Sequence, residues 1–366
     1  MRRFPPSPRL PGPSRARRLA AALALAALAG GCTGIGPRAV VTDQADYAVA
    51  LRDARKSQLL QSIVSVRNGD IPSFVRVDQI VAGYERRVAG SAGNVLGTDF
   101  LFNSDFNVFA EGSFADRPTF TLKPLQGVDY ARVVLRPVAP ADLLALASGG
   151  ADLRALFGLA VQSINGVVNQ RLPGPPPEPG ASGDFDSLIS ALTRMRDAGR
   201  LLMEFERDPE TGAPEPYLTI LDDPSGRASA DAQTVRRLLR LPEGSERHPV
   251  TLAQARRASD AIAIQTRPLI EILTDAGRTI LVEGAEEPYF LTGDWRRPPG
   301  VIVIRRTDRA PLMHGAYAAT EYNGDYYWIE TDDAPSKASF AMLMLLATVM
   351  EQTSSEANPV LLIPTN

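Results

Sequence analysis

Two pairs of adjacent aspartates are the residues of this chain best suited to acid–base chemistry. Asp222–Asp223 and Asp332–Asp333 each place two carboxyl groups side by side. Close carboxyl groups can separate their pKa values, so that one acts as the acid and the other as the base. Each pair also directly precedes a proline-containing turn, where aspartate is favoured because it hydrogen-bonds the local backbone. We therefore expect turn and capping roles, with a hydrolase acting near Asp332 and Asp333 as the alternative.

The second pair lies just before an apolar stretch that is predicted as a helix, residues 336–350. Asp333 is close enough to the expected start of this helix to interact favourably with the helix dipole. Ser336 is of the residue type preferred as an N-cap. We expect Lys337 to be solvated beside it.

Other catalytic and metal-binding patterns are missing from the sequence. The two histidines, His248 and His314, lie far apart and have no cysteine partners, although His/Cys metal sites need several such ligands. We expect each histidine on the surface or in a loop. The sequence has no Gly-x-Ser-x-Gly or Ser-x-x-Lys motif and no glycine-rich phosphate loop, which excludes the usual nucleophile and nucleotide motifs. The prediction is a protein without metal or cofactor that is not an enzyme.

An aromatic cluster near the C-terminus is the best candidate for ligand binding. It contains Tyr317, Tyr322, Tyr326, Tyr327 and Trp328, on both sides of an Asn-Gly pair. An Asn-Gly pair between alternating segments predicts a type I′ turn and a β-hairpin. Tyr322 and Tyr326 then flank the turn, and Tyr326 and Trp328 share one face. Such a face could bind a peptide or a glycan. The interpretation we prefer is that these rings cover the apolar helix that follows.

The one cysteine of the chain, Cys32, follows an unusual N-terminal segment. An apolar run over residues 19–29 is preceded by six arginines, and no acidic residue occurs before Asp43. A helix that spans a bilayer needs about 20 apolar residues, so this run is too short. Its length and basic flank are typical of a signal peptide.

Gly30 and Gly31, directly before Cys32, resemble the lipobox of bacterial lipoproteins. That family's usual pattern has leucine three places before the cysteine, where this chain has Ala29. The resemblance implies cleavage after residue 31 and lipid, palmitate included, on Cys32. The non-acidic Thr33 then implies the periplasmic face of the outer membrane of a Gram-negative envelope. An ordinary cleaved signal peptide is the alternative.

Net charge limits what the mature chain can bind. The formal charge of the full chain is −3, and loss of the six arginines of the signal leaves −9. An acidic protein has no electrostatic basis for binding nucleic acid. It also lacks a basic patch for anionic lipid, so lipid on Cys32 would provide the attachment to the membrane. The expected partners are the membrane, through this lipid, and an envelope protein.

Hydrophobic periodicity predicts a mixture of helices and short strands. Helices are predicted over residues 43–66, 127–135, 141–147, 151–168, 184–206, 230–241, 268–276 and 336–350. Strands are predicted over residues 73–83, 106–114, 119–122, 217–221, 261–265, 301–304, 316–322, 326–330 and 360–363. Residues 106–114 and 119–122 are expected to pair as a hairpin that is closed around residues 112–118. The predicted fold class is α+β, with helices and short antiparallel sheets in two lobes.

A proline-rich segment, residues 173–183, is the sharpest change of composition in the mature chain. Clustered prolines favour an extended conformation and exclude a helix or a central strand. We therefore predict a signal peptide over 1–31, a tether over 32–42, an N-terminal lobe over 43–172, a linker over 173–183 and a C-terminal lobe over 184–366. A loop inserted into one domain is the alternative for the linker.

Five further stretches resemble a family of uncharacterised bacterial lipoproteins. They are PLQG at 124–127, LRPV at 135–138, SINGVVN at 163–169, TRPLIEIL at 266–273 and DDAPSKASFAMLMLL at 332–346. The resemblance covers most of the mature chain and implies the compartment and an intact domain, but no activity.

The leading hypothesis is a non-catalytic envelope lipoprotein that binds a protein partner or scaffolds an assembly. The alternatives are a periplasmic hydrolase that uses aspartates, and a glycan-binding module that uses Tyr322, Tyr326 and Trp328.

Overall fold

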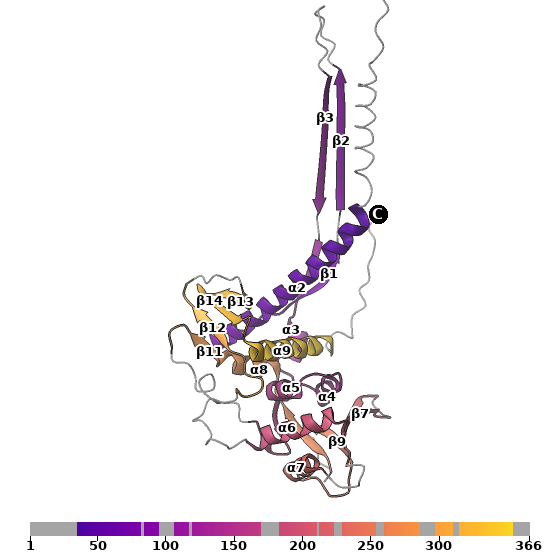
Figure 1. The fold of residues 1–366 in the computed structure, drawn as a ribbon, viewed down its shortest axis with the longest axis vertical. Coiled ribbons are helices and arrows are strands. Elements are labelled where there is room, and N and C mark those ends of the chain that lie inside the picture. The colour runs from indigo at the N-terminus through magenta and orange to yellow at the C-terminus, as the bar shows by residue number, and fades with distance from the viewer. Residues whose placement is uncertain are drawn as a thin grey trace, which may run out of the picture. The chain divides into compact units, whose positions relative to one another are not determined.

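Figure 1 shows the fold in a computed structural model. The residues described by the structure are 35–81, 84–94, 106–116, 119–169, 183–210, 212–222, 229–253, 260–285, 297–309 and 315–353. Helices and small sheets alternate along the described part, so the fold is α+β as predicted. The sheets are not purely antiparallel, however, because residues 250–252 pair parallel with 262–264, and residues 280–282 pair parallel with 304–306. Cys32, most of the proline-rich segment and the strand predicted over 360–363 lie outside the described residues.

The first described helix, α2, extends over Ile35–Arg67. Residues 35–42 of the segment predicted as a tether therefore belong to this helix. The chain divides within α2 into two compact units, Met1–Arg55 and Lys56–Asn366. In the second unit, Leu60 and Ile63 on the last turns of α2 are completely buried.

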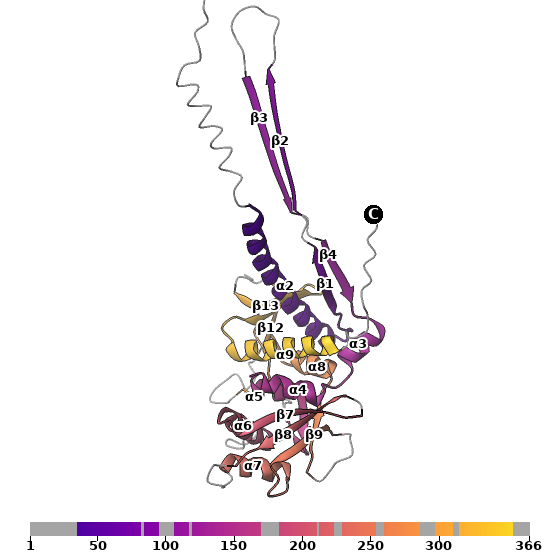
Figure 2. The ribbon, with the colours of Figure 1, turned by 90° about the vertical axis from the view of Figure 1, so that its right-hand side faces the viewer.

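Two antiparallel ladders follow α2, and they differ from the predicted pairing. β1 (Val75–Val81) pairs with β4 (Thr119–Pro124), and β2 (Tyr84–Asn94) pairs with β3 (Phe106–Asp116); Figure 2 shows the two long strands side by side. The predicted hairpin of 106–114 with 119–122 is therefore wrong. Residues 112–118 were expected to close that hairpin, but β3 continues through this segment to Asp116 and pairs with β2. The glycines and small residues of β2 concealed that strand, because such residues are poor strand formers.

The next three helices are α3 (Gly127–Val134), α4 (Pro140–Ser148) and α5 (Leu153–Ala160). The helices predicted over 127–135 and 141–147 are confirmed. The helix predicted over 151–168 is wrong in its second half, where β5 (Val161–Ile164) and β6 (Val167–Val168) form a small hairpin. Asn165 and Gly166 both have positive φ, 48° and 88°, as a tight hairpin turn requires.

A six-stranded sheet, in the order β6-β5-β10-β9-β8-β7, builds the next part of the fold. Its remaining strands are β7 (Leu201–Arg207), β8 (Pro214–Ile220), β9 (Arg247–Leu252) and β10 (Ile262–Thr266). Helices α6 (Asp184–Asp197) and α7 (Ala230–Leu239) belong to the same region. The sheet takes strands from both sides of residues 173–183, so it joins the two predicted lobes.

The helix predicted over 184–206 is too long, because α6 ends at Asp197 and residues 201–206 of the predicted helix belong to strand β7. Gly199 has a φ of +67°. A glycine in this left-handed conformation ends a helix, and it allows the chain to turn into the strand.

A four-stranded sheet, in the order β11-β12-β14-β13, completes the fold. Its strands are β11 (Ile280–Val282), β12 (Ile304–Thr307), β13 (Ala316–Tyr322) and β14 (Asp325–Glu330). Helices α8 (Leu269–Gly277) and α9 (Ala334–Thr353) accompany it. Phe340, Leu343 and Leu346 of α9 are completely buried, which confirms the central position expected of this apolar helix. Val301, Ile302 and Val303, predicted as part of a strand, are buried before β12 begins.

Candidate functional site

The predicted aromatic hairpin is formed by β13 and β14. Asn323 and Gly324 have φ values of 52° and 86°, which confirms the type I′ turn. The register places Tyr322 opposite Asp325, Glu321 opposite Tyr326 and Ala319 opposite Trp328. On its other side β14 pairs with β12, where Arg305 lies opposite Trp328. Strand β14 is therefore an inner strand with neighbours on both sides.

Alternation along β14 divides its aromatic residues between two faces of the sheet. Tyr327 is 4% exposed and Ile329 is completely buried, so they face the core. Tyr326 and Trp328 occupy the opposite face and are half-buried. We call this side the outer sheet face. Its defining residues are Arg305, Glu321, Tyr326, Trp328 and Glu330, which share that side by register.

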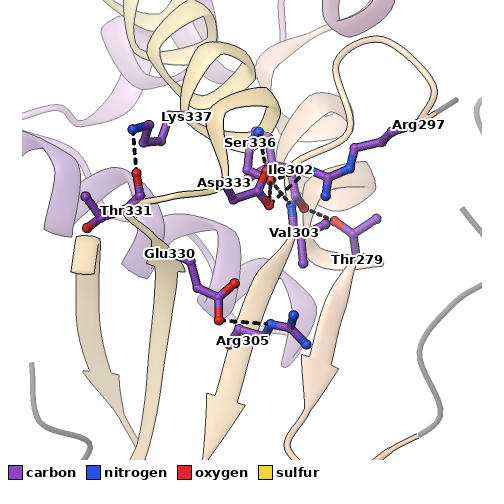
Figure 3. A network of polar contacts seen from close by, with 10 residues as sticks. All are labelled: Thr279, Arg297, Ile302, Val303, Arg305, Glu330, Thr331, Asp333, Ser336 and Lys337. Atoms are coloured by element: carbon purple, nitrogen blue, oxygen red, sulfur yellow. Dashed lines mark hydrogen bonds and ion pairs between the residues drawn. The ribbon is translucent and has the colours of Figure 1, made fainter. Parts of the chain in front are cut away.

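Charged residues flank the rings of the outer sheet face. Arg305 Nε lies 3.6 Å from Glu330 Oε1, and both side chains are partly exposed; Figure 3 shows this contact across the sheet. A partly exposed ion pair contributes little to stability. The arrangement thus combines aromatic surface with hydrogen-bond donors and acceptors at its edge.

The other aromatic residues of the cluster face the core. Tyr322 packs against the core, and its hydroxyl donates to the Asp70 carboxylate. Tyr317 makes an edge-on contact with Phe340 of α9, with ring centroids 6.1 Å apart, and Lys56 Nζ lies 3.9 Å from the centroid of the Tyr317 ring. Core packing, as we preferred, is therefore confirmed for Tyr317, Tyr322 and Tyr327. Tyr326 and Trp328 are the aromatic residues that the hairpin places on the outer sheet face.

Asp333 is the centre of a partly buried polar network at the start of α9 (Figure 3). Its carboxylate accepts hydrogen bonds from Ser336 N at 3.1 Å, Ser336 Oγ at 2.7 Å and Arg297 Nη1 at 2.7 Å. Ser336 Oγ in turn accepts from Val303 N at 2.8 Å and from Arg297 Nη1 at 2.9 Å. The network joins the first turn of α9 to the chain before β12.

This network changes the expected role of Ser336. Because α9 begins at Ala334, the N-cap is Asp333, and the prediction of Ser336 as the cap is wrong. Ser336 is completely buried and acts as a bridge, with its hydroxyl donating one hydrogen bond and accepting two. Lys337, expected to be solvated, donates to the backbone oxygen of Thr331.

The electrostatics of Asp333 disfavour acid–base catalysis by this aspartate pair. Burial raises the pKa of Asp333, but the hydrogen bonds from Ser336 and Arg297 outweigh burial and hold that pKa below its ordinary value. A carboxyl group with a lowered pKa has no proton to donate near neutral pH. Asp332 beside it is exposed. The capping role predicted for Asp333 is confirmed.

The other candidate residues for chemistry are either structural or outside the described residues. Asp222 accepts from Arg236 Nη1 of α7 at 2.6 Å, and Asp223 lies outside the described residues. His248 is completely buried on β9, and its Nδ1 lies 2.9 Å from the backbone oxygen of Asp260. The prediction of a surface or loop histidine is therefore wrong for His248, because strand β9 was not anticipated. His314 lies outside the described residues.

The described part of the chain offers no metal site, and its apolar cavity is too small for a ligand. No group of three metal-ligating side chains occurs there. A cavity of about 20 Å³ between the six-stranded sheet and its helices is lined by apolar residues such as Leu144, Phe157 and Val250. It has the volume of about one water and offers no polar partner. Nor does any described helix combine the length and the apolar character that crossing a bilayer requires.

Three residues of these arrangements were not singled out from the sequence: Arg297, Arg305 and Glu330. Arg305 and Glu330 had a detectable signal, because strand alternation places them beside the aromatic positions once strands β12 and β14 are paired. Arg297 had none, since its partner Asp333 is 36 residues away in sequence.

Comparison with protein-family models, with curated proteins and with solved structures finds no match for this chain.

Proposed function

We propose that this chain is a lipid-anchored, non-catalytic binding protein of the cell envelope, and that it binds a partner protein through the outer sheet face. The observation that carries the proposal is the position of Tyr326 and Trp328. Both are half-buried on the side of the sheet opposite to the core residues Tyr327 and Ile329.

The composition of the outer sheet face supports a protein partner. Tryptophan, tyrosine and arginine are the residues that most often dominate the binding energy of protein interfaces. Here Trp328 lies directly opposite Arg305, and Tyr326 lies two positions away on the same strand. Glu321 and Glu330 would form part of the polar rim that surrounds such contacts.

The anchor and the charge of the chain support an envelope location for this binding. The lipobox resemblance implies lipid on Cys32, and lipid attachment at more than one point would hold the protein stably at a membrane. The mature charge of −9 gives no support for nucleic acid as the partner. A protein restricted to the membrane surface meets other envelope proteins most often.

The test is quantitative affinity purification of the full chain from crosslinked membranes. We expect Trp328→Ala and Tyr326→Ala to lose the same co-purifying protein. Tyr217→Ala is the matched control, since Tyr217 is also half-buried on a strand but belongs to the six-stranded sheet. An identical set of co-purified proteins from all variants would contradict the proposal. Loss of retention on insoluble envelope glycan, with the proteins unchanged, would instead identify a glycan as the ligand.

Anchoring is tested separately with Cys32→Ala. We expect this variant to leave the membrane fraction while the wild-type chain stays in it. Equal membrane fractionation of the two chains would contradict the lipid anchor without affecting the outer sheet face.

A further inference from the structure

The long β2–β3 ladder belongs to a different sheet from the outer sheet face, so an inference from it does not depend on the proposed function. It pairs eleven residues of each strand, from Tyr84 opposite Asp116 to Asn94 opposite Phe106, without a shift of register. Within the described part of the chain, β2 and β3 form a two-stranded sheet of their own. Each strand of an antiparallel pair directs only half of its backbone N–H and C=O groups at its neighbour. No other described strand pairs with either outer edge of this ladder.

A two-stranded sheet of this kind is at most marginally stable by itself in water, and sheets normally need three or more strands. By register, one face of the ladder carries a run of small apolar residues. Positions 88, 90 and 92 of β2 pair with 112, 110 and 108 of β3, and all six residues are Val, Ala or Gly. Glu85, Arg87 and Glu111 belong to the alternate set of positions, whereas Arg86 and Asp116 share the face of the small residues at one end of the ladder. This alternation is typical of strands in a half-buried sheet.

Strands β2 and β3 contain charged residues, but they lack three other features that proteins use to prevent strand association. Such features are lysine, proline and β-bulges on exposed edges. The neighbouring β1–β4 ladder has all three, with a register shift between Val77 and Gln79 and with Lys123 and Pro124 at the end of β4. Strands β2 and β3 contain no lysine and no proline, and their register is unbroken. These three features therefore occur in the β1–β4 ladder but not in the β2–β3 ladder.

Charge favours one particular pairing of these edges. Strand β2 contains Glu85, Arg86 and Arg87, a net charge of +1, and β3 contains Glu111 and Asp116, a net charge of −2. Opposite charges across a strand pair are stabilising, whereas like charges are destabilising. Pairing of β2 with β3 of another copy is therefore favoured over pairing of two β2 strands or two β3 strands.

We propose that copies of this chain associate edge to edge, with β2 of one copy pairing antiparallel to β3 of the next. The contact is heterologous, because two different edges meet, and such contacts generate rings where the rotation closes. Each added copy extends the sheet by two strands and satisfies the edge groups of its neighbour. The partner is thus a second copy of the same chain.

The experiment measures the mass of the full chain, extracted in mild detergent, by light scattering over a range of concentrations. We expect the wild-type mass to be a multiple of the single-chain mass. Arg86→Glu with Arg87→Glu makes β2 −3, and Glu111→Arg with Asp116→Arg makes β3 +2. Either double variant alone should fall to the single-chain mass, because its two edges then repel. Lys123→Glu on β4 is the control and should keep the wild-type mass.

Mixing the two double variants is the decisive step. Each edge of one variant is then complementary to the opposite edge of the other, so the mixture should regain the wild-type mass. Mixing does not change the charges inside any single β2–β3 ladder, so recovery must come from pairing between copies. A chain with all four substitutions should also associate, and it verifies that the substitutions permit folding. A wild-type chain of single-chain mass, or recovery in the fourfold variant but not in the mixture, would overturn the proposal.

Discussion

Arg297 donates from Nη1 to both carboxylate oxygens of Asp333, at 2.7 and 2.9 Å, although 36 residues separate the two in sequence. The side chains are 18% and 11% exposed, so this ion pair is more shielded from solvent than a surface pair. It fixes the residue that caps α9 to the chain preceding β12. The central helix and the four-stranded sheet are thereby held in one arrangement.

Removal of the Asp333 carboxylate should destabilise the chain. Asp333→Ala deletes an N-cap, which costs about 0.5–2 kcal/mol, and leaves the Arg297 charge partly buried without its partner. We expect the free energy of unfolding in urea to fall by about 2 kcal/mol or more, since losing one partner of a shielded pair adds to the cost of the cap. The matched control is Asp332→Ala, because Asp332 is adjacent but exposed. Equal losses in both variants would show that the network has no special role.

The pH dependence of the same contact has a defined sign. Because the folded pKa of Asp333 lies below its ordinary value of 3.8, the unfolded chain binds more protons in this range, and stability falls as pH falls. The contribution is complete above the unfolded pKa and disappears as pH decreases through the lower folded pKa. Asparagine at this position cannot titrate. The difference in unfolding free energy between wild type and Asp333→Asn should therefore be constant near neutral pH and shrink in acid. A difference that stays unchanged down to about pH 2, near the usual lower range of carboxyl pKa values, would contradict this assignment.

The two faces of β14 predict mutational effects of different size at neighbouring positions. Tyr327→Ala removes a ring that is 4% exposed, and loss of a buried aromatic side chain costs about 3–5 kcal/mol. Trp328→Ala removes a half-buried ring on the outer sheet face and should cost less than half as much. Urea unfolding of the two variants measures the difference directly. The assignment of faces would be wrong if Trp328→Ala proved the more destabilising change.

Residues that favour tight turns allow hairpins to be predicted from the sequence, but only where the flanking segments alternate clearly. Asn323–Gly324 separates two alternating segments, so the hairpin that positions Tyr326 and Trp328 was found correctly. Asn165–Gly166 is the same signal, but it lies inside a long apolar stretch, and helical periodicity concealed it. The choice of face was harder, because alternation shows which residues of β14 share a side but not which side the core occupies. That depends on the tertiary packing of α9 against the sheet.

The pairing of strands that lie far apart in sequence could not be predicted from the sequence. The partner of β3 is β2 and the partner of β1 is β4, although residues 112–118 were expected to form a turn between strands adjacent in sequence. Register between distant strands is specified by which face is buried, and this is unknown before the fold is known. The role of Asp333 was predicted because a cap depends on neighbours in sequence, whereas its Arg297 partner depends on tertiary structure.

Close packing of α5 against the chain before β12 gives the sharpest test of the core. A Cβ atom added at Gly158 of α5 would lie 2.5 Å from the backbone oxygen of Pro299. The obstacle is backbone, so α5 or the segment around Pro299 must move, and overpacking of this kind costs about 1–3 kcal/mol. Gly158→Ala should therefore lower the free energy of unfolding by that amount. Gly149→Ala is the control, because Gly149 has a φ of −72° and its added Cβ would come no closer than 3.4 Å to a neighbour. If the two alanine variants unfolded at the same urea concentration, the packing of α5 on Pro299 would be looser than this arrangement requires.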